Sequence, residues 1–221
     1  GEQGLSLTIK PGEKFAFVGR TGSGKSTMFK AILRFRDCFE GSILIDNVDT
    51  ATVSHDLLRS RMSCVTQENV LFSTTLRKNL DPGASYDDVQ IWNVLEKVGL
   101  KDRVMNCNGN LEMEISSGEG DLFSLGERQL ISLARALLRN TRILLLDEAT
   151  AAIDVLADKT IQDVVAGLEG ITILSIAHRL STIVGFDRVA VLSDGELIEC
   201  GSPKMLLKDK DSAFYALANA H

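Results

Sequence analysis

Apolar and polar positions follow two alternating patterns along most of the chain. Short apolar runs of strand length recur at Lys14–Val18, Arg142–Leu146, Thr172–Ile176 and Arg188–Leu192. Between such runs, apolar residues recur at helical spacing, as in the stretch Lys25–Phe35. Because strands that alternate with helices are typical of a parallel sheet covered by helices, we predict an α/β fold with a mainly parallel sheet.

Turn and capping residues predict where several of these elements begin and end. Asp46-Asn47 follows the strand-like Ser42–Ile45, and Asp194-Gly195 begins a hairpin turn into Glu196–Cys200. Ser54 is a predicted N-cap for a helix over 55–61. Ser202-Pro203 predicts the start of the last helix, since proline suits the first helical turn.

The middle of the chain has a different pattern. Residues 71–138 predict helices and loops without a convincing strand. Ser85-Tyr-Asp-Asp88 has the form of a capping box, and Val89, Trp92 and Val98 share a helical stripe that Gly99 ends. We therefore predict one domain, in which a helical subdomain (71–138) is inserted into an α/β core made of 1–70 and 139–221.

Composition and charge exclude several classes of partner and site. The formal net charge of −6 argues against a sequence-independent grip on nucleic-acid phosphates, so no nucleic acid is expected as a partner. The apolar runs are at most six residues long, which is too short to span a bilayer, and the start of the chain does not resemble a signal peptide. Four scattered cysteines without Cys-x-x-Cys spacing predict neither a metal site nor a disulfide framework.

A glycine-rich segment between a predicted strand and a predicted helix carries the clearest chemistry. Its residues are Gly19, Arg20, Thr21, Gly22, Ser23, Gly24, Lys25, Ser26 and Thr27. Glycines allow the backbone to turn tightly and aim N–H groups at phosphate oxygens, and the helix N-terminus adds its positive dipole end. The pattern predicts that Lys25 contacts the β- and γ-phosphates of a nucleotide and that Ser26 binds Mg²⁺.

Two adjacent acids end the predicted strand over 142–146. Burying Asp147 and Glu148 together is costly without a cation or a protonated partner. We predict that Asp147 holds a Mg²⁺-linked water, and that Glu148 acts as the base, or the orienting group, for an attacking water. The pattern is weak alone, and it gains weight beside the glycine-rich segment.

Two further polar residues follow predicted strands. Gln67 comes after the strand-like Met62–Thr66, and its amide oxygen could ligate Mg²⁺ or the attacking water. His178 follows the strand over 172–176, at the carboxyl end where open α/β sheets bind ligands. Each is more often a solvated or structural residue when it occurs alone.

Six motifs together resemble the ABC ATPase family. They are the segment Gly19–Thr27, Gln67, Phe123-Ser-Leu-Gly-Glu-Arg-Gln-Leu130, Leu146-Asp-Glu-Ala-Thr150, Ala151-Ala-Ile-Asp154 and His178. The resemblance implies the family's P-loop fold, with antiparallel strands in the N-terminal part and an inserted helical subdomain. It also implies that the chain binds and hydrolyses Mg²⁺-ATP to drive export.

The resemblance assigns the remaining candidate site residues and partners. Ser124 and Gly126 would belong to the signature segment (Phe123–Leu130), which meets the γ-phosphate of an ATP held by a second nucleotide-binding domain. Asp154 would lie in the loop that touches that partner, and Gln67 would couple nucleotide to transmembrane domains. The implied setting is the cytosolic face of a membrane, with a head-to-tail dimer over two ATPs. The domain alone is expected to be monomeric, and the adenine-stacking aromatic would lie upstream of Gly1.

Finer features are similar to the second nucleotide-binding domain of the multidrug-resistance-associated (C) subfamily. They are Val70–Ser73, Leu76–Pro82, Leu130–Arg139 and Asp147–Ala152. The signature segment departs from the consensus Leu-Ser-Gly-Gly-Gln at Leu125 and Glu127. A nucleotide-sensing domain that gates a channel, and a soluble ABC ATPase of translation or DNA repair, remain alternatives at this point.

Overall fold

The computed structural model describes residues 5–66, 70–115, 122–147, 155–177 and 183–219. The chain divides into two compact units. The first contains Gly1–Cys64, Arg142–Glu148 and Glu169–His221, and the second contains Val65–Thr141 and Ala149–Leu168.

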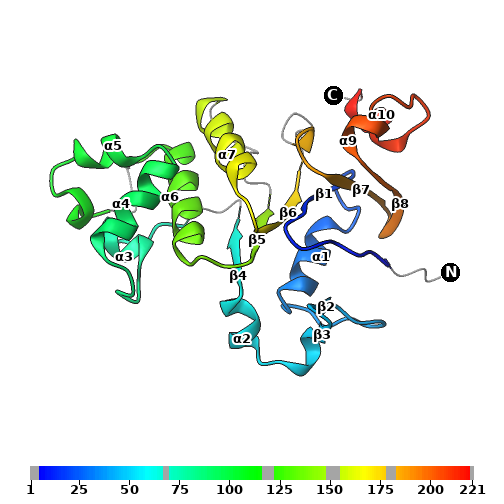
Figure 1. Ribbon diagram of the computed structural model, residues 1–221, viewed down its shortest axis with the longest axis horizontal. Coiled ribbons are helices and arrows are strands. Elements are labelled where there is room, and N and C mark those ends of the chain that lie inside the picture. The colour runs from blue at the N-terminus through cyan, green and yellow to red at the C-terminus, as the bar shows by residue number, and fades with distance from the viewer. Residues whose placement is uncertain (1–4, 67–69, 116–121, 148–154, 178–182, 220–221) are drawn as a thin grey trace. The chain divides into compact units, whose positions relative to one another are not determined.

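The first unit is built on a sheet whose strands are mostly parallel (Figure 1). Its strands are β1 (Lys14–Val18), β4 (Met62–Val65), β5 (Ile143–Asp147), β6 (Thr172–Ile176), β7 (Arg188–Ser193) and β8 (Glu196–Gly201). Their order across the sheet is β4-β5-β6-β1-β7-β8. β1 pairs in parallel with β6 and β7, β5 pairs in parallel with β6, and β8 is antiparallel to β7. The predicted α/β fold with a mainly parallel sheet is confirmed.

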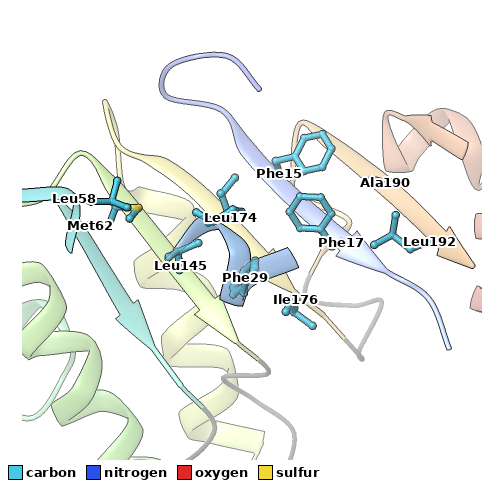
Figure 2. Packing of buried hydrophobic residues seen from close by; sticks show 11 residues of the cluster. Phe15, Phe17, Phe29, Leu58, Met62, Leu145, Leu174, Ile176, Ala190 and Leu192 are labelled. Atoms are coloured by element: carbon cyan, nitrogen blue, oxygen red, sulfur yellow. The ribbon is translucent and has the colours of Figure 1, made fainter. Parts of the chain in front are cut away.

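The core of this unit forms between the sheet and helix α1 (Lys25–Ile32). Phe15 and Phe17 are fully buried on β1, and they lie on the same face because side chains alternate along a strand. The ring of Phe17 meets that of Phe29 of α1 edge-on, with 6.3 Å between centroids. Figure 2 shows these rings in one cluster with apolar side chains of the neighbouring strands. Burial of this apolar surface fixes α1 beside β1 and so fixes the connection between them.

Short elements occupy the segment after α1. β2 (Leu44–Ile45) and β3 (Val48–Asp49) form an antiparallel hairpin. Its turn residues Asp46 and Asn47 both have positive φ, as the favoured two-residue hairpin turn requires. This hairpin supplies antiparallel strands in the N-terminal part of the chain, whereas residues 5–10 form no strand. The 3₁₀ helix η1 (Thr50–Thr52) precedes α2 (His55–Ser60), where Ser54 accepts a hydrogen bond from Leu57 N and is confirmed as the N-cap.

The C-terminal helices differ from the prediction. Pro203 occupies the first turn of α9 (Pro203–Leu206), but the side chain of Ser202 makes no capping hydrogen bond. This is not the last helix, because α10 (Ala213–Ala218) follows with Ser212 as its N-cap. The Ser212 hydroxyl also donates to Glu199 of β8, so a contact distant in sequence helps to set the start of α10.

The second unit consists mainly of helices (Figure 1). They are α3 (Leu76–Leu80), α4 (Asp88–Lys97), α5 (Lys101–Met105), the 3₁₀ helix η2 (Asn110–Glu112), α6 (Leu125–Leu138) and α7 (Val155–Gly167). The long helix α6 packs against α3, α4 and α7. An isolated antiparallel bridge joins Thr75 to Glu114. The subdomain boundaries 71–138 stay a prediction.

Helix α4 begins at a different cap from the one predicted. Asp87, not Ser85, is the N-cap, and its reciprocal partner is Gln90. The preceding backbone is held in a turn because Tyr86 N donates to the buried carboxylate of Asp81. The predicted stripe is also wrong at Val89, which is 66% exposed, although Val98 is buried. The buried face of α4 is formed by Ile91, Val94 and Leu95.

Candidate functional site

The glycine-rich segment connects β1 to α1 within the first unit. β1 ends at Val18 and α1 begins at Lys25. Gly24 caps the helix in the left-handed region, at φ 101°, and its carbonyl accepts a hydrogen bond from Met28 N. Glycine adopts this backbone conformation without the steric penalty of other residues, and the chain can therefore turn directly into the helix. We call residues 19–27 the nucleotide loop.

Lys25 is enclosed by the nucleotide loop. Its side chain starts on the first residue of α1, and the residue is only 5% exposed. The ammonium Nζ donates to the carbonyl oxygens of Gly19 at 2.7 Å and Arg20 at 2.9 Å, and it lies 3.4 Å from Ser23 Oγ. A buried ammonium is stable only with such partners, and they hold a positive charge inside the loop beside a helix N-terminus. This arrangement fits an anionic phosphate.

The β7–β8 hairpin supports the nucleotide loop from a distant part of the sequence. Gly195 N donates to the carbonyl of Ser23 at 3.2 Å. A Cβ added to Gly19 would lie 2.3 Å from the carbonyl oxygen of Leu192, so this position has no room for a side chain. The sequence predicted Asp194-Gly195 as a turn and did not predict its contact with the loop. Local turn signals carry no information about which distant segment the turn will touch.

Asp147 ends β5 at the same edge of the sheet as the nucleotide loop. In the strand register Asp147 is opposite Ile176, and Ile176 is opposite Phe17 near the end of β1. Burial, and then the charge of Asp147, raise the pKa of the Cys64 thiol to about 11. The strand register places Asp147 and the nucleotide loop at the same carboxyl edge of the parallel strands, where open α/β sheets bind ligands.

Four predicted site residues fall outside the described residues. They are Gln67, Glu148, Asp154 and His178. Ser26 and Thr27 are described, and both are exposed in the first turn of α1. The hydroxyl of Ser26 and the carboxylate of Asp147 are hard oxygen donors, which suit Mg²⁺. Within the described ranges, no group of three or more His, Cys, Asp or Glu side chains could hold a metal ion.

The signature segment begins α6 in the second unit. Ser124 is the N-cap, and it forms a capping box with Glu127: Ser124 N donates to Glu127 Oε2 at 2.8 Å, and Glu127 N donates to Ser124 Oγ at 3.2 Å. The carboxylate of Glu127 therefore satisfies the helix start. A serine hydroxyl that accepts a hydrogen bond can still donate its own proton. Gly126 is buried in the first turn, and Leu125 is 46% exposed.

Arg103 of α5 also contacts this helix start, and the sequence analysis did not predict it. Its Nε is 3.2 Å from Glu127 Oε1. No motif marks Arg103, because the contact joins residues 24 positions apart in different helices. The sequence indicates that Glu127, at the third helical position, pairs with its N-cap Ser124. The capping pattern does not indicate that Glu127 has a second partner.

A strand, a glycine-rich loop and a helix that together enclose a lysine at the edge of a parallel sheet define a P-loop nucleotide-binding domain. Residues 3–151 match the family model described as ABC transporter. The chain therefore belongs to the ABC transporter family. The ATPases of ABC exporters contain this domain, and the resemblance that the motifs indicate is confirmed.

Similar proteins belong to the C subfamily. The chain is 42% identical over 219 residues to ABC transporter C family member 8 of Dictyostelium discoideum. This match covers 99% of this chain and 14% of that protein. It is 44% identical over 215 residues to metal resistance protein YCF1 of Saccharomyces cerevisiae (96% of this chain, 14% of that protein). It thus spans about a seventh of the length of these relatives.

A solved structure supports the fold. A bacterial Atm1-family ABC exporter with ATP bound matches with a TM-score of 0.89 and 35% identity, over 97% of this chain and 37% of that one. No helix within the described part of the chain has the length and apolar character needed to cross a membrane.

Proposed function

We propose that this chain is the second nucleotide-binding domain of an ABC exporter, and that it binds and hydrolyses Mg²⁺-ATP to drive export. The observation that carries the proposal is the buried ammonium of Lys25, held by loop carbonyls beside the start of α1. The names of the relatives, transporters and a metal resistance protein, favour an exporter over a channel regulator or a soluble ATPase.

The residues of the nucleotide loop bind and orient the phosphates in this proposal. Backbone N–H groups of the loop and the ammonium of Lys25 donate to phosphate oxygens. Ser26, Asp147 and Gln67 hold Mg²⁺, directly or through water. When bound, Mg²⁺ supplies positive charge that neutralises the phosphates. Glu148 accepts the proton of the attacking water, and His178 and Gln67 orient the reacting groups.

Two partners complete the proposal. The first is a set of transmembrane domains in the same transporter, which the length of the relatives supports. The second is another nucleotide-binding domain, placed head to tail so that two ATPs lie between the domains. Ser124 and Gly126 then meet the γ-phosphate of the ATP held by the partner, and Asp154 contacts the partner domain. The domain lies at the cytosolic face of the membrane.

The test is equilibrium binding of ATP and of adenosine to the full-length transporter, with and without Mg²⁺. Lys25→Ala should weaken one of the two ATP sites roughly ten- to hundredfold, because charge-assisted hydrogen bonds of about 1.5–3 kcal/mol are lost. Adenosine binding should not change, since Lys25 contacts phosphate and not base. Lys30→Ala, on the exposed side of α1, is the matched control. Unchanged ATP affinity at both sites of Lys25→Ala would contradict the assignment.

A further inference from the structure

Glu127 places a carboxylate in the first turn of α6, beside Ser124 and Gly126. The proposed function brings a phosphate to this helix start, and two negative charges at close range repel each other. Yet α6 begins with a complete capping box that requires a Glu or Gln side chain at this position. The side chain of Glu127 therefore stabilises the start of the helix through its hydrogen bonds, but its negative charge does not favour the binding of a phosphate there.

Both carboxylate oxygens of Glu127 are engaged within the second unit. Oε2 accepts the hydrogen bond from Ser124 N, and Oε1 lies 3.2 Å from Arg103 Nε. The side chain of Glu127 is 26% exposed and that of Arg103 is 43% exposed. Because the pair is only partly in water, its charges are screened less than those of fully exposed residues.

Each nitrogen of the Arg103 guanidinium group has a partner, and two of the three partners lie in or next to the signature segment. Nε contacts Glu127, NH2 donates to the carbonyl of Leu122 at 2.7 Å, directly before the segment, and NH1 lies 2.9 Å from Cys107 Sγ, just after α5. The group also lies over the ring of Phe123, with its Cζ 5.6 Å from the centroid. A planar fork with several donors can make these contacts together, whereas the single ammonium of lysine cannot.

We propose that Arg103 is a positioning residue for the signature segment: it cancels the charge of Glu127 and fixes Leu122–Glu127, so that the start of α6 can accept the γ-phosphate of the partner's ATP. The proposal rests on the proposed function. It also accounts for the departure from consensus at Glu127, because the Arg103 charge restores the electrostatic balance that a neutral glutamine would have.

The test is the release rate of ATP from the full-length transporter in a Lys25→Ala background, where the remaining ATP is the one that faces this signature segment. Arg103→Gln leaves Glu127 uncompensated, and ATP release should become about two- to fivefold faster. Glu127→Gln keeps the capping box and leaves Arg103 uncompensated, so release should slow by a similar factor. The double variant Arg103→Gln/Glu127→Gln should return to within about twofold of the background, since both charges are absent.

Two controls separate charge from general loss of structure. Arg77→Gln removes another arginine of the same unit, which pairs with Asp88 and Glu112, and it should leave ATP release unchanged. The differences among the Arg103 and Glu127 variants should also shrink as salt is raised. If Arg103→Gln does not fold, Glu127→Gln alone decides, because faster or unchanged release in that variant overturns the proposal.

The outcomes keep the two proposals apart. If Lys25→Ala removes one ATP but Arg103→Gln releases the other at the background rate, the role of Arg103 is wrong and the proposed function stands. Faster release in Arg103→Gln that Glu127→Gln fails to rescue also overturns the proposal, since Arg103 then acts through something other than this charge. If Lys25→Ala leaves the ATP affinity of both sites unchanged, the proposed function itself fails.

Discussion

The nucleotide loop and the start of α6 both present a helix N-terminus, and they are held in different ways. In the loop, backbone carbonyls enclose Lys25, and the β7–β8 hairpin leaves no room for a side chain at Gly19. At α6, side chains fix the geometry: Glu127 accepts a hydrogen bond from Ser124 N and forms an ion pair with Arg103. A geometry fixed by the backbone requires glycines at fixed positions, whereas one fixed by side chains can tolerate a changed residue if its partner compensates.

The largest expected effect tests the chemistry beside the loop. Glu148→Gln should keep ATP binding and lower steady-state hydrolysis by the full-length transporter about 10²–10⁴-fold, because an amide cannot accept the proton of water. The check is ATP turnover together with ATP binding. Turnover within a few fold of the unchanged transporter would mean that Glu148 is not the base.

A second change tests whether the backbone fixes the loop. Gly19→Ala should lower the free energy of unfolding by about 2–3 kcal/mol and weaken ATP binding, because its Cβ would lie 2.3 Å from the carbonyl oxygen of Leu192. Gly12 also has positive φ but has open space around it, so Gly12→Ala should cost only about 1 kcal/mol. Chemical denaturation of both variants measures the difference, and equal losses would contradict the close approach.

A third change concerns the strand that leads into the loop. The buried carboxylate of Glu13 accepts hydrogen bonds from Arg188 Nε at 2.5 Å and Lys10 N at 2.6 Å. Burial raises the pKa of Glu13, but the bonds to Arg188 and Lys10 outweigh burial and hold it below the ordinary value of 4.5. Glu13→Gln should therefore lower the free energy of unfolding by about 1–2 kcal/mol at pH 7.

The same variant has a defined pH dependence. Because the carboxyl pKa of Glu13 is lower in the folded state, the ionised side chain stabilises the protein above about pH 4.5. This stabilisation is lost as the pH falls through the pKa of the folded state. The stability difference between Glu13→Gln and the unchanged chain should thus shrink below pH 4.5. Glu96→Gln, which breaks an exposed pair with Lys101, is the control and should cost less than about 0.5 kcal/mol. A difference that persists unchanged in acid would contradict the ion pair.

The smallest expected effect tests the signature segment. Leu125 is 46% exposed at the first position of α6, where the consensus has glycine, and the proposed function brings a phosphate to this helix start. Leu125→Gly should lengthen the retention of the partner's ATP about two- to fivefold, a gain of up to about 1 kcal/mol. Leu125→Ala should give an intermediate value. Release rates that do not follow side-chain size would show that this departure is neutral.

Sequence patterns predicted the loop because its glycines, lysine and hydroxyl residues lie in nine consecutive positions, although they did not predict its contact with the β7–β8 hairpin. They also predicted the parallel strands, since each is a short buried apolar run. They failed where a side chain outside the capping pattern takes part: Asp81 accepts a hydrogen bond from Tyr86 N in the turn before the Asp87 cap of α4, and Glu199 of β8 accepts one from Phe214 N at the start of α10. The role of Arg103 belongs to the same class, because side-chain pairs between helices leave no local periodicity.

The central claim is that one chain serves two different ATPs, one through the nucleotide loop and the other through the signature segment. A cryo-EM map of the ATP-bound, full-length Glu148→Gln transporter tests it most directly. The account predicts that Lys25 Nζ lies within hydrogen-bonding distance of the phosphates of one ATP, and that Ser124 Oγ lies within that distance of the γ-phosphate of the other. A map in which both residues contact the same ATP, or in which Lys25 contacts no phosphate, would contradict the account.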